Sequence, residues 1–174
     1  MTGLPKYARI EIERRWPFDL ARCPPFDECA GAKITDRYVA ESFLRLRKIE
    51  YPTGEVTYKL CKKYDRIAPL GQPIVNIYLT SGEFDLLNQL PGRVVVKRRH
   101  RYAEGAVDIY CSDDARLTIF EVEFEDFSSA ATYTAPEFVL DEVTHDPRYS
   151  GANLAGAPVG CSPAEMITRS SRIR

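Results

Sequence analysis

The sequence predicts a mainly β domain with some α content: an antiparallel closed barrel of about eight strands with short helices packed outside. Three observations lead to this expectation. Apolar and polar residues alternate with a period of two along most of the chain, which is typical of half-buried strands. Only two segments have the pattern of short helices, too few for a fold that connects successive parallel strands by helices. One face of most strands carries charges of a single sign, whereas a surface built for solubility usually mixes both signs.

The first half of the chain contains strand patterns separated by turn signals. The loop at 17–33 is rich in Pro, Cys and Asp and separates the first strand from the second. The Pro-Thr-Gly turn at 52–54 makes a hairpin of the third and fourth strands. The expected strands here are 7–16, 34–39, 42–50, 55–64 and 74–79.

The second half holds both predicted helices. The segment 80–83 has capping-box spacing, Thr with Glu three residues later, and predicts a helix over 82–90. The segment 134–137 has the same spacing with a proline at an early helical position, and predicts a second helix to about residue 143. The expected strands are 93–102, 106–111 and 117–127. We expect residues 1–155 to form a single domain and 156–174 to form a C-terminal tail.

Composition excludes several classes of protein. A formal net charge of -1 argues against duplex nucleic-acid binding, which usually needs a basic excess, but permits a local cationic pocket. No apolar run approaches the roughly 20 residues of a membrane-spanning helix, and the N-terminus lacks the apolar stretch of a signal peptide. We therefore expect a cytoplasmic protein without a membrane partner. The five cysteines are scattered and show neither a disulfide framework nor zinc-ligand spacing, so we expect reduced, mostly buried thiols.

The charged strand faces are the main functional signal. Residues at i and i+2 of a strand project to one side about 7 Å apart, so each pair aims in one direction. The opposite faces are apolar and need cover, which the two helices could supply from outside. The charged faces would then line the interior, although a solvated outer face remains the plainer alternative. The acidic residues are Glu11, Glu13, Asp108, Glu121 and Glu123, and the basic ones are Arg45, Arg47, Lys59, Lys97 and Arg99.

An interior with carboxylates on one wall and cations on another is suited to polyphosphate chemistry. Mg²⁺ takes oxygen ligands and commonly bridges to substrate phosphates. Arginine binds phosphate oxygens bidentately, and lysine adds a point charge. Confined carboxylates raise each other's pKa, so such a site needs a cation.

The series of motifs resembles the CYTH, or triphosphate tunnel metalloenzyme, family, which includes inorganic triphosphatases, thiamine triphosphatases and class IV adenylyl cyclases. The segment 11–15, Glu-Ile-Glu-Arg-Arg, is similar to the family's N-terminal Glu-x-Glu-x-Lys signature. The segments 45–47, 57–59 and 97–99 resemble its paired arginines, its lysine strand and its Lys-x-Arg strand. Asp108 with 121–124 resembles its C-terminal acidic set, and 143–155 resembles its closing segment. The resemblance covers roughly residues 7–155.

The resemblance implies a divalent-metal-dependent phosphohydrolase that acts on inorganic tripolyphosphate or an organic triphosphate, with Mg²⁺ or Mn²⁺ as cofactor. A metal-activated water would attack the terminal phosphorus. Glu11, Glu13 and Lys59 would be the catalytic residues. The metal ligands would be Glu11, Glu13, Asp108, Glu121 and Glu123, and the substrate would be bound by Arg15, Arg45, Arg47, Lys59, Lys97 and Arg99.

The sequence departs from the family pattern at three places. Arg15 stands where the signature has lysine. Asn76 and Tyr78 are neutral on a strand that often carries an arginine and acidic residues in the family. The 17–33 loop is long and could alter one mouth of the barrel.

Two other functions stay open besides the triphosphatase. The neutral strand favours a non-catalytic polyphosphate- or nucleotide-binding module on the same barrel. An adenylyl cyclase is the third possibility, although no residue pattern selects adenine. The expected partner is a small molecule bearing a triphosphate, and a closed barrel with few free strand edges favours a monomer.

Overall fold

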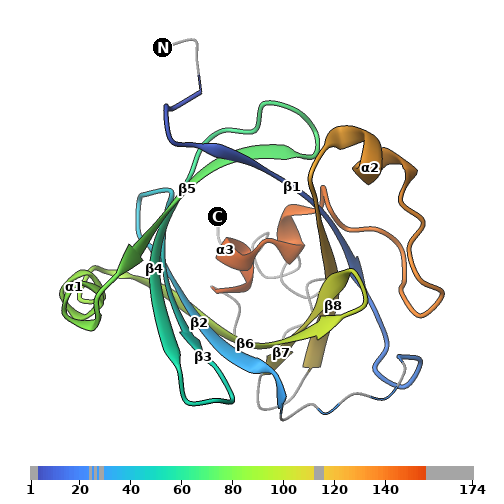
Figure 1. Ribbon diagram of the computed structural model, residues 1–174, viewed down its shortest axis with the longest axis horizontal. Helices are drawn as coiled ribbons and strands as arrows, with labels where there is room; N and C mark the ends of the chain where they lie inside the picture. The colour runs from blue at the N-terminus through green and yellow to red at the C-terminus, as the bar shows by residue number, and fades with distance from the viewer. Residues whose placement is uncertain (1–3, 24, 26, 28–29, 112–115, 156–174) are drawn as a thin grey trace, which may run out of the picture.

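The computed structural model describes residues 4–23, 25, 27, 30–111 and 116–155. Eight antiparallel strands close into a barrel, as predicted (Figure 1). The observed strand bounds lie within about three residues of the expected ones. The strands are β1 Arg9–Pro17, β2 Ala32–Val39, β3 Leu44–Glu50, β4 Val56–Lys63, β5 Gly71–Leu79, β6 Gly92–Tyr102, β7 Gly105–Cys111 and β8 Arg116–Phe124.

The order of strands around the barrel is β1-β5-β4-β3-β2-β6-β7-β8, and β1 closes the ring by pairing with both β5 and β8. This order separates the charged strands in space. The acidic strands β1 and β8 are neighbours, and the strands halfway around the ring from them are β2 and β3. The paired arginines of β3 therefore face the acidic strands across the interior.

The pairing register puts the charged residues on one common face. Arg47 lies opposite Lys59 of β4 on one side and Asp36 of β2 on the other. Arg15 lies opposite Glu121 of β8. Because directly paired residues share a face of the sheet, these side chains all project into the barrel.

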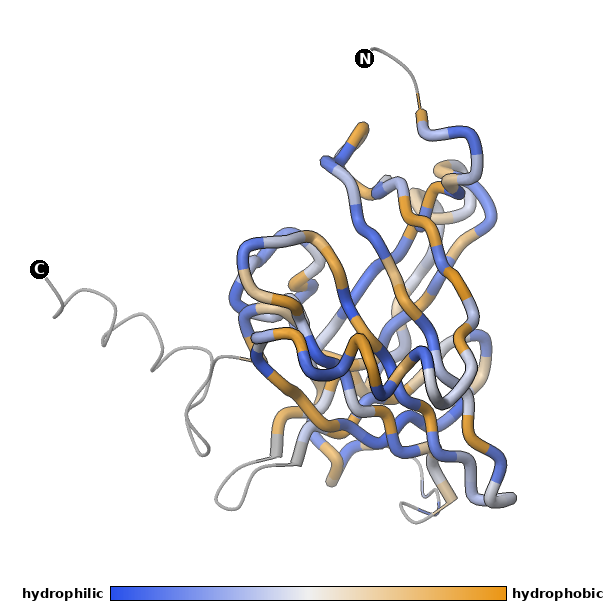
Figure 2. The backbone as a smooth tube through the Cα atoms, turned by 90° about the vertical axis from the view of Figure 1, so that its left-hand side faces the viewer, coloured by the Kyte–Doolittle hydropathy of each residue, from blue (hydrophilic) through white to orange (hydrophobic). Residues whose placement is uncertain are grey.

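The hydrophobic core lies outside the barrel. Hydropathy alternates along the strands (Figure 2), and the apolar side chains of β1, β7 and β8 point outward. Tyr133 and Phe138, from the segment that follows β8, pack over this face. The inverted arrangement confirms the prediction that the charged faces point inward, and contradicts the alternative of a solvated charged surface. The buried cluster consists of Trp16, Phe18, Val107, Ile109, Phe120, Val122 and Phe138.

The first predicted helix is present. α1 spans Ser81–Leu87, and its N-cap Thr80 forms the expected capping box with Glu83. Phe84 is buried and stacks near Tyr58 of β4, with ring centroids 4.7 Å apart. The helix was predicted over 82–90 but ends at Leu87, and Leu90 beyond it is 39% exposed.

The second helix was predicted in the wrong place. α2 spans Phe127–Thr132 with Asp126 as N-cap, whereas 134–143 runs as an extended strap along β1. The backbone N–H groups of Leu140 and Val143 donate to the carbonyls of Pro17 and Arg15, at 2.8 and 2.9 Å. These donors thus bond to the sheet instead of to a helix. The last strand was predicted to run to residue 127, but β8 ends at Phe124 because α2 begins at Phe127.

The chain after the strap returns to one end of the barrel. A 3₁₀ turn, η2 (Pro147–Tyr149), leads into α3 (Gly151–Leu154), which lies over the opening in the view along the barrel (Figure 1). A Cβ at Gly151 would lie 2.0 Å from the hydroxyl oxygen of Tyr38 of β2, so only glycine permits this close approach.

In the part of the chain that the structure describes, no helix is long and apolar enough to cross a bilayer. Cys61 is buried and Cys23 is half-buried, and both are free thiols. The described residues leave out Cys29, Cys161, the tail at 156–174 and residues 112–115, which include the Ser-Asp-Asp segment that the sequence predicts as a turn.

Candidate functional site

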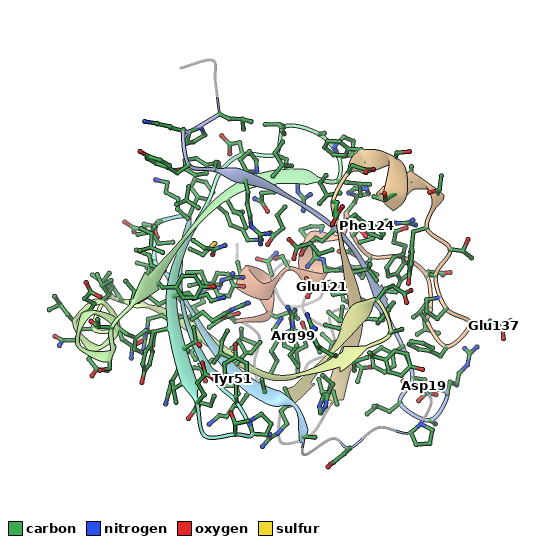
Figure 3. All side chains as sticks on the ribbon, in the orientation of Figure 1. Asp19, Tyr51, Arg99, Glu121, Phe124 and Glu137 are labelled. Atoms are coloured by element: carbon green, nitrogen blue, oxygen red, sulfur yellow. The ribbon has the colours of Figure 1, made fainter. Side chains whose placement is uncertain are left out.

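A cavity of about 920 Å³ occupies the barrel interior. Figure 3 shows Arg99 and Glu121 pointing into it, while Asp19 and Glu137 lie outside the barrel. The structure thus brings ten of the eleven predicted site residues into the wall of one cavity. These ten are Glu11, Glu13, Arg15, Arg45, Arg47, Lys59, Lys97, Arg99, Glu121 and Glu123. Asp108 lies opposite Arg99 on the same inward face, but it is 1% exposed and covered by its neighbours.

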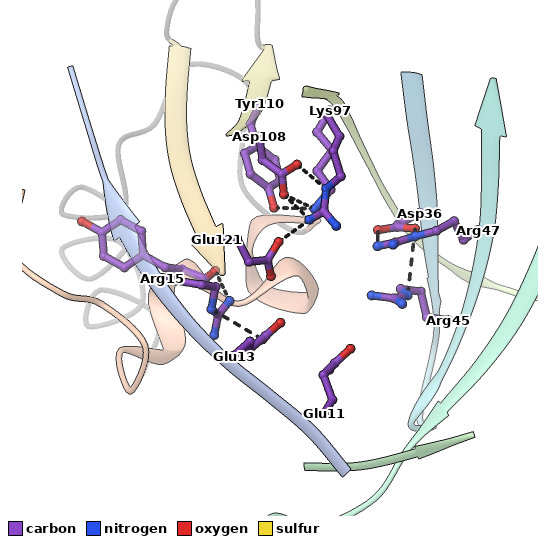
Figure 4. A network of polar contacts seen from close by, with 12 residues as sticks. Glu11, Glu13, Arg15, Asp36, Arg45, Arg47, Lys97, Asp108, Tyr110 and Glu121 are labelled. Atoms are coloured by element: carbon purple, nitrogen blue, oxygen red, sulfur yellow. Dashed lines mark hydrogen bonds and ion pairs between the residues drawn. The ribbon is translucent and has the colours of Figure 1, made fainter. Parts of the chain in front are cut away.

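The acidic wall comes from β1 and β8. Glu11, Glu13 and Glu121 are largely buried and point into the same space (Figure 4). Glu123 is different, because its side chain is 52% exposed and pairs with Arg9 at 2.8 Å. The predicted acidic set therefore divides into three inner carboxylates and one nearer to solvent.

Each inner carboxylate has a cationic partner. Lys63 of β4 donates to Glu11 at 2.6 Å, Arg15 lies 3.7 Å from Glu13, and Arg99 donates to Glu121. Burial alone would raise the pKa of Glu11, but Lys63 and then Arg45 lower it below its usual value. The same pairing raises the pKa of Lys63 against the opposing effect of burial. Internal ion pairs thus compensate the buried charges of the acidic wall.

Glu13 of β1 and Glu121 of β8 are diagonal neighbours on two paired strands. Burial and the nearby Glu11 act to raise the pKa of Glu13, while Lys63, Arg15 and a hydrogen bond with the Glu121 side chain lower it. Ionised carboxylates that are crowded into a confined site repel one another. This arrangement is one that a metal ion would relieve.

The acidic wall fits a hard divalent cation in its chemistry. It offers only oxygen donors, which Mg²⁺ and Mn²⁺ prefer, and cationic residues lie nearby to bind a phosphate. Within the described residues, no three potential ligand side chains lie close enough together to hold a metal ion. The ion pairs to Lys63, Arg15 and Arg99 account for this spacing, since each draws a carboxylate toward its own partner.

The cationic wall comes from β3, β4 and β6. Arg47 donates two hydrogen bonds to Asp36 of β2, from Nε at 2.6 Å and from Nη2 at 2.7 Å. Arg45 has Nε 4.0 Å from the same carboxylate. Lys59 lies over the ring of Tyr78, 4.7 Å from its centroid, and has no carboxylate partner in the described chain.

A second buried aspartate supports the β6 cations. Both oxygens of Asp108 accept from Arg99, at 2.7 and 2.6 Å, and Lys97 donates to one of them at 2.5 Å. Burial and the neighbouring Arg99 lower the pKa of Lys97 in spite of Asp108. Burial, together with Asp108 and Glu121, raises the pKa of the adjacent Tyr110. The carboxylate of Asp108 is thus engaged by two cations, and its predicted role as metal ligand stays a prediction.

Among the residues that the structure describes, two buried guanidinium nitrogens have no hydrogen-bond partner. These are Nε of Arg15 and Nε of Arg45, on opposite sides of the cavity. A buried donor without a partner costs free energy, so such groups usually mark the position of a water or ligand. Both donors are suited to an anionic oxygen.

Arg15 also holds the closing segment of the chain. Its Nη1 donates to the carbonyl of Tyr149 at 3.0 Å, and its backbone N–H donates to the Thr144 hydroxyl at 2.9 Å. A second hollow of about 480 Å³ lies beside this segment and shares Glu13, Arg15 and Arg45 with the main cavity. One side chain thus joins the acidic wall to the chain that covers the end of the barrel.

The neutral wall predicted at Asn76 is present. Asn76 lines the cavity on β5, and the register places Gln72 and Ile74 on the same face. Tyr78 shares this face but is 70% exposed, under the side chain of Lys59. The barrel therefore has an uncharged strand between the acidic β1 and the basic β4.

Comparison with known structures places the fold. A crystal structure of the inorganic triphosphatase NE1496 matches with a TM-score of 0.53 and 23% identity, over 86% of this chain and 97% of that one. The fold is that of a CYTH domain. A second structure of NE1496, described as a hypothetical protein, matches the CYTH barrel with a TM-score of 0.53 and 22% identity, over 84% of this chain and 98% of that one. No family model matches the chain, and neither does any curated protein.

The sequence reasoning overlooked two residues of the CYTH interior. Lys63 follows Lys59 by four positions on one strand and therefore shares its face, which is a signal that was available. Asp36 stands alone between apolar and uncharged neighbours on its face, Ile34 and Tyr38, and its partner becomes evident only from the pairing of β2 with β3.

Proposed function

We propose that this protein is a divalent-metal-dependent phosphohydrolase that acts on a triphosphate inside the barrel. The proposal rests on one observation: two charged walls face each other across the barrel cavity. The acidic wall is on β1 and β8, and the basic wall is on β3, β4 and β6. A chain of phosphates with its metal has the complementary charges. The fold that the chain shares with an inorganic triphosphatase supports the same conclusion.

The cations would bind and orient the phosphates. Arg45 and Arg47 would meet the substrate from β3, Lys59 from β4, and Lys97 and Arg99 from β6. The unpartnered Nε of Arg45 would donate to a phosphate oxygen without first breaking a hydrogen bond. Arg15 would do the same from the opposite wall. An arginine in place of the lysine of the family signature would therefore still bind phosphate.

Glu11, Glu13 and Glu121 would hold Mg²⁺ or Mn²⁺, with Glu123 and Asp108 as the remaining predicted ligands. The metal would supply charge neutralisation and an activated water when bound. Substrate binding would replace the internal ion pairs. Phosphates would bind Lys63, Arg15 and Arg99, and the metal would bind the carboxylates that these cations release. Glu11 and Glu13 would also orient the water, and Lys59 would stabilise charge on the phosphate that it contacts.

Phosphate release from tripolyphosphate, ATP and thiamine triphosphate, with and without Mg²⁺ or Mn²⁺, tests the proposal. We expect metal-dependent release from at least one substrate, reduced by about a hundredfold or more in Glu11→Gln or Glu121→Gln because each removes a metal-binding charge. Glu125→Gln, at an exposed position just after β8, is the matched control and should keep full activity. Full activity in both site variants would refute the assignment.

A binding module is the second candidate, and the uncharged face of β5 favours it. This function predicts saturable triphosphate binding with no turnover in any divalent metal. An adenylyl cyclase would form cyclic AMP from ATP under the same conditions, and the absence of that product would remove it. A cytoplasmic location, where such substrates are abundant, and a monomeric state stay predictions.

A further inference from the structure

We propose that Asp36, a buried residue on the inward face of β2, is a positioning residue that fixes the Arg47 guanidinium for phosphate binding. The inference rests on the proposed function, because it assigns how one of the substrate-binding arginines is oriented. Asp36 does not line the cavity, and none of the sequence motifs includes it.

The geometry of the pair is the first support. Asp36 is 2% exposed, and its two oxygens accept separately from Nε and Nη2 of Arg47. A bidentate pair fixes the plane of the guanidinium as well as its position. Nη1 of Arg47 is then the donor nitrogen left for a ligand, in a side chain that lines the cavity.

The location of Asp36 is the second support. It is the β2 residue opposite Arg47, and Arg45 is 4.0 Å from the same carboxylate (Figure 4). Burial would raise the pKa of Asp36, yet Arg47 and Arg45 hold it at about 2, so the carboxylate is ionised under all ordinary conditions. A buried charge of this kind must be paired, and removing one partner leaves the other uncompensated.

Two effects of removing this charge have opposite signs, which makes the inference testable. Asp36→Asn removes a negative charge from beside two arginines, and by Coulomb attraction alone it would strengthen binding of an anion. It also removes the bidentate pair, and a displaced guanidinium would weaken binding. A positioning role requires that the second effect is the larger.

The experiment measures the affinity of the full chain, with Mg²⁺, for an imido analogue of tripolyphosphate that resists hydrolysis. It compares wild type, Asp36→Asn, Arg47→Lys and the double variant. We expect each single change to raise Kd about tenfold, because each leaves the cationic group at position 47 misplaced. The double variant should also lie about tenfold above wild type, because lysine cannot form the bidentate pair that Asp36 supports. Tighter binding in Asp36→Asn, or a double variant about a hundredfold weaker, would overturn the inference.

A matched control and a ligand-free measurement separate this result from instability and from failure of the proposed function. Glu142→Gln removes a bidentate partner of Arg14 on the outside of the barrel and should leave Kd unchanged. In the ligand-free wild type, the Nε–H resonance of Arg47 should exchange slowly with solvent, and it should exchange rapidly in Asp36→Asn. Rapid exchange in wild type would refute the positioning role even if Asp36→Asn did not fold. If wild type did not bind the analogue, the proposed function would fail. The exchange rate of the Arg47 Nε–H would still show whether Asp36 fixes the guanidinium.

Discussion

At the scale of single residues, the barrel interior depends on buried charges that are paired across strands. Asp36 pairs with Arg47, Asp108 with Arg99, and Glu11 with Lys63, each between different strands. The like-charge i, i+2 pairs were visible in the sequence because one strand carries both members. The cross-strand partners were not, since they depend on a register that only the closed barrel defines.

The Asp36 carboxyl predicts a specific pH dependence. Its pKa is lowered from an ordinary 3.8 to about 2 by Arg47 and Arg45, which outweigh burial. A lowered pKa contributes stability that is fully present above pH about 4 and is lost as the pH falls through about 2, a contribution of about 2 kcal/mol. Carbon-13 NMR of the Asp36 carboxyl should therefore show it ionised down to pH about 2 or to acid unfolding. A midpoint near 3.8 in the folded protein would contradict the pairing.

At the scale of elements, the stabilising apolar contacts lie between the outside of β1, β7 and β8 and the segment that follows α2, which comprises Tyr133 and the strap at 134–143. The sequence predicted that helices would cover this face, and α2 with the strap does cover it. It misplaced the helix because a capping-box pattern is also compatible with a strap whose N–H groups bond to β1. The segments 80–83 and 134–137 have the same capping-box spacing. A helix follows only the first, because the backbone after the second bonds to β1 instead.

Phe138→Ala tests this assignment of the core. Phe138 is buried against Phe18 and Phe120, so its loss should lower the free energy of unfolding by about 3 kcal/mol and Tm by about 10 °C. Leu140→Ala, in the same strap but 50% exposed, should change stability by less than about 1 kcal/mol. Thermal unfolding followed by circular dichroism measures both, and equal effects would show that the strap is not the core cover.

At the scale of the whole molecule, the barrel is inverted: its core is outside and its charges are inside. The sequence predicted this inversion because most strands carry charges of a single sign on one face, whereas a solvent-exposed surface usually mixes both signs. Ten of the predicted site residues line one cavity for the same reason. The sequence could not show that the interior charges pair with each other. Because of these pairs, we expect metal binding and phosphate binding to depend on each other. A phosphate that takes Lys63 leaves Glu11 unpaired unless a metal binds it.

Titration calorimetry of the full chain with an imido analogue of tripolyphosphate, which resists hydrolysis, tests this account most directly. With Mg²⁺ present we expect saturable binding at one site, and without it an affinity at least about tenfold lower, because the released carboxylates would remain buried and uncompensated. Equal affinity with and without Mg²⁺ would contradict the exchange of ion pairs. No binding under either condition would contradict the assignment of the interior as a triphosphate site.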